Sequence, residues 1–286
     1  MTPRKIALCS DVQAEPLPGT AKTGELFVAL EHPYGWGHDI LDGHAFGDDL
    51  TAELKKYTAS HKVQLQLIRR PGREGQRVEQ PTVLIADVFG EVRRLAIPEP
   101  AALLDIDPHV AVGTKVDHPV LLVCTHGKRD RCCAIKGRPL AAALAAGFPG
   151  GLIWESSHTK GHRFAPSIIA LPWGYSFGHL NEHAAKDLVL HLQRGELFLP
   201  GNRGRSCWDA RGQVAELAVA ARNPGTQAGE LRIAEVEENT AVVEGGTGQR
   251  WLVELEPQLV DGVVSSCGDA PKQGKSWSAI SVTELS

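Results

Sequence analysis

Short apolar runs alternate with polar loops in the middle of the chain, and this pattern predicts a small α/β unit. Residues 118–124 (HPVLLVC) are apolar and rich in β-branched side chains, as in a buried strand. Residues 138–147 predict a helix, because proline suits a first helical turn and glycine suits the end. Residues 151–155 predict a second strand. The remaining predicted elements are two strands within residues 165–180 and a helix that begins after the N-cap residue Asn181.

The first hundred residues predict the same order of elements, offset by roughly 90 residues from the second series. Residue identities barely repeat, so the pattern indicates a duplicated structure and not a repeated sequence. Coincidence is the alternative, because such orders are common in α/β proteins. The elements of this first series are a strand at 25–31, a loop at 32–47, a helix from Asp48, a strand at 63–68, a hairpin at 81–100 that turns at Phe89 and Gly90, and a short helix at 101–104.

The last third of the chain has a different character. Residues 202–212 are polar and predict a link, whereas residues 213–222 predict a helix. Two or three short strands follow, with one apolar face. From Gly268 onward the residues are small and polar, which predicts a loose end without a recognisable motif. The apolar face of the strands comprises Trp251, Val253 and Leu255.

The composition is that of a globular chain and excludes several functions. A length of 286 residues suggests two domains. The net charge of −4 gives no basic excess, which argues against a nucleic-acid surface. No run of about 18 apolar residues occurs, so no membrane span is predicted. The opening MTPRKIALCS lacks the apolar segment of a secretory signal, and six cysteines are too few for a disulfide scaffold; we therefore expect a cytoplasmic protein with reduced cysteines.

Cysteine and histidine are concentrated in the centre of the chain. Three of the six cysteines and seven of the twelve histidines lie between residues 118 and 191. Cys124-x8-Cys133 follows the first central strand, and His158-x3-His162 follows the second. Adjacent parallel strands bring such loops to one edge of a sheet. The four residues together indicate a metal site, although each alone is compatible with a buried thiol or an ordinary loop histidine.

Spacing alone leaves the identity of the metal open. Zinc knuckles use closely spaced cysteine pairs, and the eight residues between Cys124 and Cys133 are too many for that motif. A binuclear iron cluster needs two ligands on each iron, which long loops accommodate better. Zinc and [2Fe–2S] both remain open at this point.

Two segments of the sequence resemble a known family. CTHGKRDRCCAIKGRP and WESSHTKGHRFAPSIIALPWGYSFGHL resemble the sucrase/ferredoxin-like family, a branch of the thioredoxin-like [2Fe–2S] ferredoxins. The opening CSDVQAEPLPGTAKT is similar to the N-terminal signature of that family, so the resemblance covers roughly residues 6–200. The branch with two histidine ligands carries Cys-x8-Cys and then His-x-(Gly or Val)-Gly-His. The resemblance implies that Cys124 and Cys133 bind one iron, and His158 and His162 the other.

Two positions depart from the family pattern. Lys160 stands where the family has glycine or valine, which places a cation near the site. Cys132 is an additional thiol beside Cys133, so an exchange of the two as ligand stays open. Five residues next to the motif are candidates for groups that surround the cluster, with ordinary loop or surface roles as the alternative: His126, Arg129, Cys132, Lys160 and Arg163.

The predicted fold is α/β, with two thioredoxin-like units in tandem and a small C-terminal α+β region. Residues 1–112 form the predicted N-terminal unit, which holds no cluster because its loop at 32–47 lacks cysteine. Residues 113–200 form the predicted ferredoxin unit, and residues 201–286 form the C-terminal region.

The implied ligand set predicts the redox behaviour. Two thiolates and two neutral imidazoles leave an oxidised [2Fe–2S] site formally neutral, whereas four thiolates make it doubly negative. Reduction is therefore easier, as in Rieske centres, and the imidazoles couple it to pH. Lys160 and Arg163 favour the reduced state because they are cations.

The predicted function is electron transfer or redox sensing and not catalysis on a substrate of its own. The sequence identifies no electron donor, acceptor or oligomeric state. Two alternatives remain: a structural zinc-binding interaction protein, and a thiol oxidoreductase of thioredoxin fold. Against the oxidoreductase, no Cys-x-x-Cys occurs and a disulfide between Cys132 and Cys133 would be strained. No role is predicted for the remaining thiols Cys9, Cys207 and Cys267.

Overall fold

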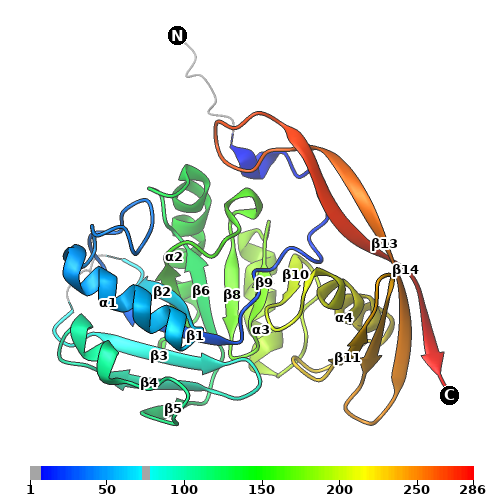
Figure 1. Ribbon diagram of the computed structural model, residues 1–286, viewed down its shortest axis with the longest axis horizontal. Coiled ribbons are helices and arrows are strands. Elements are labelled where there is room, and N and C mark those ends of the chain that lie inside the picture. Colours follow the sequence, from blue (N-terminus) through cyan, green and yellow to red (C-terminus); the bar gives the residue numbers. More distant parts are fainter. Residues whose placement is uncertain (1–7, 73–77) are drawn as a thin grey trace.

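The chain folds into a mixed α/β structure with a large curled sheet and a second, antiparallel sheet (Figure 1). The computed structural model describes residues 8–72 and 78–286. The large sheet has ten strands in the order β10-β9-β8-β6-β7-β2-β1-β3-β4-β5, and the small sheet has the order β11-β12-β13-β14. The four α-helices are α1 (Gly47–Ser60), α2 (Arg138–Gly147), α3 (Glu182–Gln193) and α4 (Ala210–Arg222).

The two halves of the large sheet repeat one connection order. In each half the first strand pairs in parallel with the second and antiparallel with the third, and the fourth pairs antiparallel with the third. A helix connects the first two strands in both halves, as the hydrophobic pattern predicted. The strands of the first half are β1 (Leu26–Glu31), β2 (Gln64–Arg69), β3 (Thr82–Asp87) and β4 (Val92–Ala96); those of the second are β6 (Val120–Cys124), β7 (Ile153–Ser156), β8 (Ile168–Leu171) and β9 (Tyr175–Phe177).

The helices of the second half follow from their sequence signals. Helix α2 has proline in its first turn and ends at Gly147, as predicted. Helix α3 begins after Asn181, whose side chain accepts a hydrogen bond of 2.9 Å from the backbone N–H of Ala184. Both helices bury apolar faces, represented by Leu144 and Leu188, against the sheet. The central strands β1 and β6 are buried along their whole length, because helices or loops cover both faces.

Within the large sheet, the two halves are joined by pairing between the ends of β2 and β7. These strands pair antiparallel through Ile68 with Ser156 and Arg69 with Glu155. A nearly buried ion pair of 2.7 Å joins the Arg69 guanidinium to the Glu155 carboxylate at this junction. Both strands pair through their last residues, so the loops that follow the parallel strands of the two halves lie near one another in the middle of the molecule.

Residues 202–205 contradict the prediction of a polar link, because they form strand β10 (Asn202–Arg205) at the edge of the large sheet. Both arginines of this strand are buried, and protein oxygens satisfy their donors. The Arg203 Nε donates to the Thr20 hydroxyl, and an Arg205 terminal nitrogen donates to the Val88 carbonyl at 2.7 Å. A polar sequence can therefore form a buried strand when its hydrogen bonds are satisfied.

The C-terminal sheet is longer than predicted. Trp251, Val253 and Leu255 lie buried on one face, as expected, and pack with helix α4. The residues after Gly268 form a strand, so the prediction of a loose end was wrong. The strands are β11 (Arg232–Val236), β12 (Thr240–Glu244), β13 (Arg250–Val263) and β14 (Lys272–Leu285).

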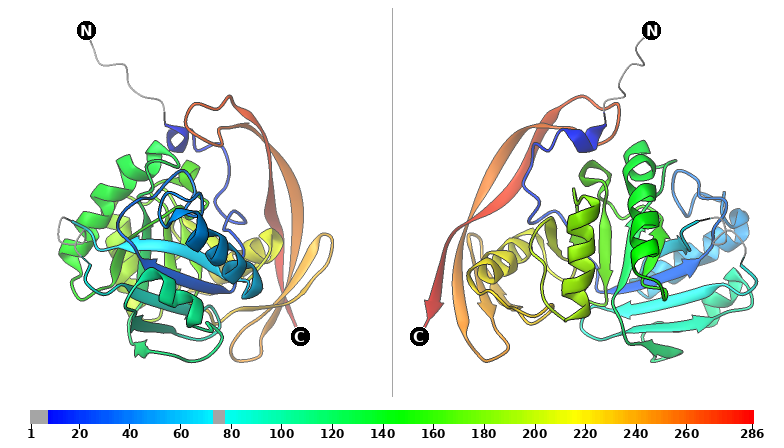
Figure 2. Two further views of the ribbon diagram at one scale, coloured as in Figure 1. Left: turned by 60° about the vertical axis from the view of Figure 1, so that its left-hand side comes forward. Right: turned by 180° about the vertical axis from the view of Figure 1, so that it is seen from behind.

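The hairpin of β13 and β14 extends beyond the small sheet and arches over the molecule. Its connecting segment lies beside the short 3₁₀ helix Cys9–Asp11 near the N-terminal end of the described chain (Figures 1 and 2). The remaining short elements are β5 (Thr114–Val116) and the 3₁₀ helices Pro100–Asp105 and His162–Phe164.

A buried carboxyl group on α4 makes stability depend on pH. The Tyr175 hydroxyl donates to Glu216 at 2.6 Å, and the Glu216 side chain has no solvent exposure. Burial raises the pKa of Glu216 to about 7, although Tyr175 and Arg205 oppose the shift. The folded state therefore retains a proton that the unfolded state has lost, and the associated stability is present below about pH 4 and disappears as pH rises through 7.

The Glu216→Gln variant should remove this pH dependence. We expect the free energy of unfolding of the parent protein to fall, relative to the variant, by about 2–3 kcal/mol between pH 4 and pH 8. Denaturant titrations at both pH values measure the difference. Parallel pH profiles for the two proteins would show that Glu216 is already ionised in the folded state.

Candidate metal centre

The carboxyl ends of two adjacent parallel strands bring the predicted ligands together. Cys124 is the last residue of β6 and lies opposite Ser156, the last residue of β7. His158 follows β7 by two residues. The loops after both strands therefore begin at the same edge of the sheet, as the sequence predicted.

Three of the four predicted ligands form one compact group. The ligand atoms of Cys124, Cys133 and His158 all lie within 4.8 Å of one another. Both cysteine side chains are fully buried, and the histidine is partly exposed. The Nδ1 atom of His158 is buried and has no hydrogen-bond partner among the described residues. Two sulfur donors and an unpartnered imidazole nitrogen are a donor set that fits a transition metal.

A helical turn positions Cys133 in this group. The segment Cys133–Gly137 forms a π-helical turn that continues into α2. Gly137 packs against the carbonyl group of Cys124, and any side chain at this position would collide with that oxygen. The start of the helix therefore lies directly against the end of β6. The positive end of a helix dipole also favours a negative charge on a nearby sulfur.

The pKa values of the two cysteines of the group shift in opposite directions. Burial alone would raise the pKa of Cys124, but interactions with the Cys133 and His158 side chains outweigh it and bring the pKa well below its usual range. The pKa of the Cys133 thiol is raised, chiefly by its hydrogen bond with Cys124 and then by burial. The geometry therefore favours one thiolate next to one thiol, and a bound cation would displace the remaining proton.

His162 lies next to this group but is not one of its members. Its Nδ1 atom is 3.4 Å from the Nε2 atom of His158, and the two ring centres are 5.0 Å apart. On its other side, Nε2 lies 2.5 Å from the Ser265 carbonyl oxygen and 3.0 Å from the Ser266 hydroxyl. A ligand histidine typically donates its second N–H to such a carbonyl. This contact leaves Nδ1 of His162 on the side of His158.

The loop between the two histidines is held in a tight conformation. Lys160 has a φ of +57°, a left-handed conformation that favours glycine and is uncommon for a lysine. A side chain on Gly161 would collide with the buried guanidinium of Arg203 and lie 2.8 Å from the Ser167 hydroxyl. Close packing against Arg203 thus explains the need for glycine at position 161.

The other residues predicted around the site have separate environments. His126 is buried and its Nε2 contacts the Gly37 carbonyl oxygen at 2.7 Å. Arg129 reaches His38 at 3.0 Å, in the loop that follows β1. The charge of Arg163 is offset, because its Nε pairs with the Glu15 carboxylate at 2.5 Å. The predicted contribution of Arg163 to the electrostatics of the site is therefore reduced. Cys132 points to another group of residues, described below.

A cavity of about 280 Å³ opens beside His158. Residues of both halves line it, including Lys22, His38, His126 and Lys160. Burial lowers the pKa of Lys22, and the nearby positive charge of Lys160 lowers it further. The histidine side of the site is thus accessible from a basic cavity, whereas the cysteine side is closed.

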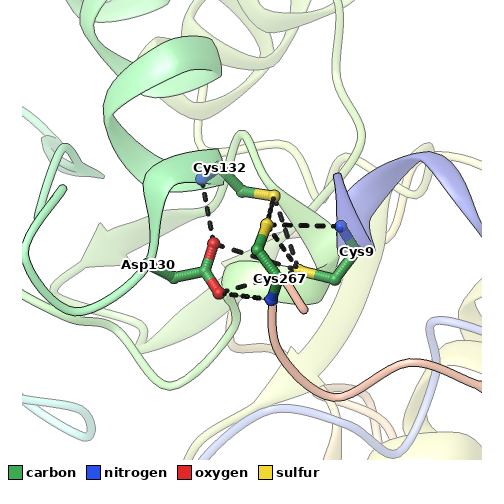
Figure 3. A group of neighbouring side chains, drawn as sticks. All are labelled: Cys9, Asp130, Cys132 and Cys267. Carbon is green, nitrogen blue, oxygen red and sulfur yellow. Dashed lines mark hydrogen bonds between the residues drawn. The ribbon is translucent and has the colours of Figure 1, made fainter. Parts of the chain in front are cut away.

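A second group of possible metal ligands was missed in the sequence. Cys9, Asp130, Cys132 and Cys267 have ligand atoms within 4.8 Å of one another (Figure 3). Two of the thiols for which the sequence predicted no role, Cys9 and Cys267, therefore lie in one group with Cys132. No local spacing signals this group, because its cysteines come from the two ends and the middle of the chain.

These features define a mixed α/β protein with candidate Cys/His and Cys/Asp metal-binding groups. The model of the sucrase/ferredoxin-like family matches residues 17–204, more than half of the chain, and the protein belongs to that family. A comparison with curated proteins finds no match, and neither does a comparison with solved structures. Within residues 8–72 and 78–286, no helix is both long and apolar enough to cross a membrane.

Proposed function

We propose that Cys124, Cys133, His158 and His162 bind a [2Fe–2S] cluster and that the protein is an electron carrier or redox sensor. The observation that carries this proposal is the convergence of two buried thiols with His158 at the end of β6 and β7. Family membership supports it, because the chain matches the sucrase/ferredoxin-like family over residues 17–204.

The environment of the histidines supports their role as ligands. His158 has a buried nitrogen without a partner in the described part of the chain. The contact of His162 with Ser265 supports Nδ1 as the metal-binding atom, because Nε2 then carries the proton donated to the carbonyl oxygen. We propose that the cysteine pair binds one iron and the histidine pair the other.

The proposed site has a buried side, formed by Cys124 and Cys133, and an accessible side, where His158 lines the cavity. A bound [2Fe–2S] cluster would supply one-electron transfer, at a potential above that of clusters with four cysteines. Cys124 and Cys133 bind on the buried side and exclude water there. His158 lines the basic cavity, where a redox partner can approach. Lys160 adds a positive charge on this side.

We also propose that the two halves are tandem thioredoxin-like units, residues 1–112 and 113–200, followed by a C-terminal region at 201–286. The shared strand order of the two halves supports this division. The loop 32–47 of the first unit contains no cysteine, and it contacts the second unit through the Gly37 carbonyl oxygen and His126. In this proposal the first unit covers the cluster site of the second.

Metal and sulfide analysis of the anaerobically purified full chain tests the proposed function. We expect about two irons and two acid-labile sulfides per chain, with the visible absorbance of a [2Fe–2S] protein. Apoprotein treated with iron and sulfide should recover this absorbance. Protein that contains zinc but neither iron nor sulfide, and that does not take up a cluster on reconstitution, would contradict the proposal.

A further inference from the structure

Three cysteines that are remote in the sequence meet at one point of the structure. Cys9 begins the 3₁₀ helix Cys9–Asp11, Cys132 precedes the turn of Cys133, and Cys267 lies between β13 and β14. The sulfur of Cys132 is 3.4 Å from that of Cys9 and 3.1 Å from that of Cys267. The sulfurs of Cys9 and Cys267 are 3.7 Å apart (Figure 3).

These distances suit a single shared cation. A disulfide places two sulfurs about 2 Å apart and leaves a third one unused. Tetrahedral zinc has Zn–S bonds of about 2.3 Å, which puts its sulfur ligands about 3.8 Å apart. All three observed separations are nearer to the second value than to the first. A cluster with one cysteine on each iron would hold the three sulfurs farther apart.

Asp130 completes the group with an oxygen donor. Its side chain is only 6% exposed, and its two oxygens lie 4.0 and 3.9 Å from the sulfur of Cys9. Each oxygen also accepts a backbone hydrogen bond of 2.9 Å, one from the N–H of Cys132 and one from that of Cys267. The carboxylate thus holds two of the cysteine-bearing segments together and presents oxygen to the third cysteine.

The pKa of Cys132 is lowered, whereas the pKa values of Cys9 and Cys267 are raised. The pKa of Cys132 is lowered to about 6, mainly because its sulfur is hydrogen-bonded with Cys9. Burial opposes this shift. The same hydrogen bond is the main cause that raises the pKa of Cys9. Burial raises the pKa of Cys267 to about 11. The Ser10 hydroxyl donates to the sulfur of Cys132 at 3.3 Å, which suits a thiolate.

We propose that Cys9, Cys132 and Cys267, together with Asp130, form a second metal site that takes one zinc ion. Three thiolates and a carboxylate in a closed, nearly buried group supply the four protein ligands that a closed tetrahedral zinc site needs. Binding releases the thiol protons and leaves each sulfur bound to the same ion. The site does not depend on the cluster proposed above, because it shares no ligand with it.

The zinc site fastens the C-terminal hairpin to the rest of the molecule. The outer part of this hairpin is exposed, as the 65% exposure of Leu259 shows. Its connecting segment contacts the body through Cys267 and, two residues earlier, through the Ser265 carbonyl oxygen on His162. In this proposal zinc joins the N-terminal segment, the start of the helix and the hairpin end, and it keeps the hairpin end in contact with His162. Figures 1 and 2 show the hairpin end beside the N-terminal segment.

Metal analysis of single variants tests the proposal. We expect the full-length parent protein to retain about one zinc per chain after dialysis, apart from any iron. Cys9→Ala and Cys267→Ala should each lose at least tenfold in zinc affinity, measured by competition with a chromophoric chelator. Cys207→Ala is the matched control and should retain the metal, because Cys207 belongs to neither group. Equal zinc retention in all three variants would overturn the proposal.

Alkylation of the parent protein provides a test that does not depend on the folding of the variants. With zinc bound, Cys9, Cys132 and Cys267 should resist alkylation, and all three should react after a chelator is added, as peptide mass mapping can show. Protection that is unchanged by the chelator would overturn the proposal, as would a disulfide between two of the three cysteines. Loss of iron instead of zinc from Cys9→Ala would also overturn it. The iron content of the parent protein tests the cluster separately.

Discussion

The Cys133→Ala variant should lose its [2Fe–2S] cluster. The side chain of Cys133 is fully buried and lies in one group with Cys124 and His158. Alanine removes a sulfur donor that no other described residue of that group can replace. We expect iron and sulfide to fall from about two per chain to a small residual fraction, and the visible absorbance to disappear.

Neighbouring cysteines supply the controls for this experiment. Cys132→Ala should retain iron and sulfide, because the side chain of Cys132 contacts Cys9 and Cys267 instead. Cys207→Ala should also retain them, and it controls for the loss of a thiol elsewhere in the chain. Retention of the cluster in Cys133→Ala together with its loss in Cys132→Ala would assign the ligand role to Cys132. That result would contradict the arrangement proposed here.

The His158→Cys and His162→Cys variants should keep a cluster but lower its reduction potential. Each substitution replaces a neutral imidazole with a thiolate and adds one negative charge to the site. Clusters with two histidines have potentials well above those of clusters with four cysteines, so we expect a decrease on the order of 200 mV for each variant. Spectroelectrochemical titration of the purified variants measures this change.

The pH dependence of the potential distinguishes ligand histidines from nearby ones. In the parent protein we expect the potential to fall with rising pH, by up to about 59 mV per unit where one proton accompanies one electron. His158→Cys and His162→Cys should flatten this dependence. His38→Cys is the matched control, since His38 lines the cavity but lies outside the ligand group. A variant with unchanged potential and pH profile would remove its histidine from the ligand set.

Much of the fold could be predicted because its signals are local. Helix α2 (Arg138–Gly147) has the predicted bounds, since a proline and a glycine mark its start and end. The convergence of Cys124 with His158 also followed from the sequence, because parallel strands present their ends at one edge. Local spacing was therefore sufficient to bring three of the four predicted ligands, Cys124, Cys133 and His158, together.

Features that depend on distant contacts could not be predicted. Strand β10 has a polar sequence, and its burial depends on partners such as Thr20 and Val88. The group of Cys9, Cys132 and Cys267 unites segments more than one hundred residues apart. No periodicity or spacing carries this information, because the meeting point depends on where the β13–β14 hairpin ends.

The different directions of Cys132 and Cys133 are also a property of the three-dimensional structure. Successive residues at the start of a helix point about 100° apart, so the two thiols cannot both face the same group. Cys133 faces the Cys124 group and Cys132 faces the Cys9 group. In the sequence the two thiols are simply adjacent, whereas in the structure each belongs to a different group.

Electron paramagnetic resonance of the anaerobically reduced full chain tests the central claim most directly. We predict the signal of a reduced [2Fe–2S] cluster that integrates to about one spin per chain, with hyperfine coupling to histidine nitrogens that decreases in His158→Cys and in His162→Cys. A zinc site at these residues would give no such signal. An iron-loaded protein whose cluster signal lacks nitrogen coupling, or a reconstituted protein with no cluster signal, would contradict a cluster bound by two cysteines and two histidines.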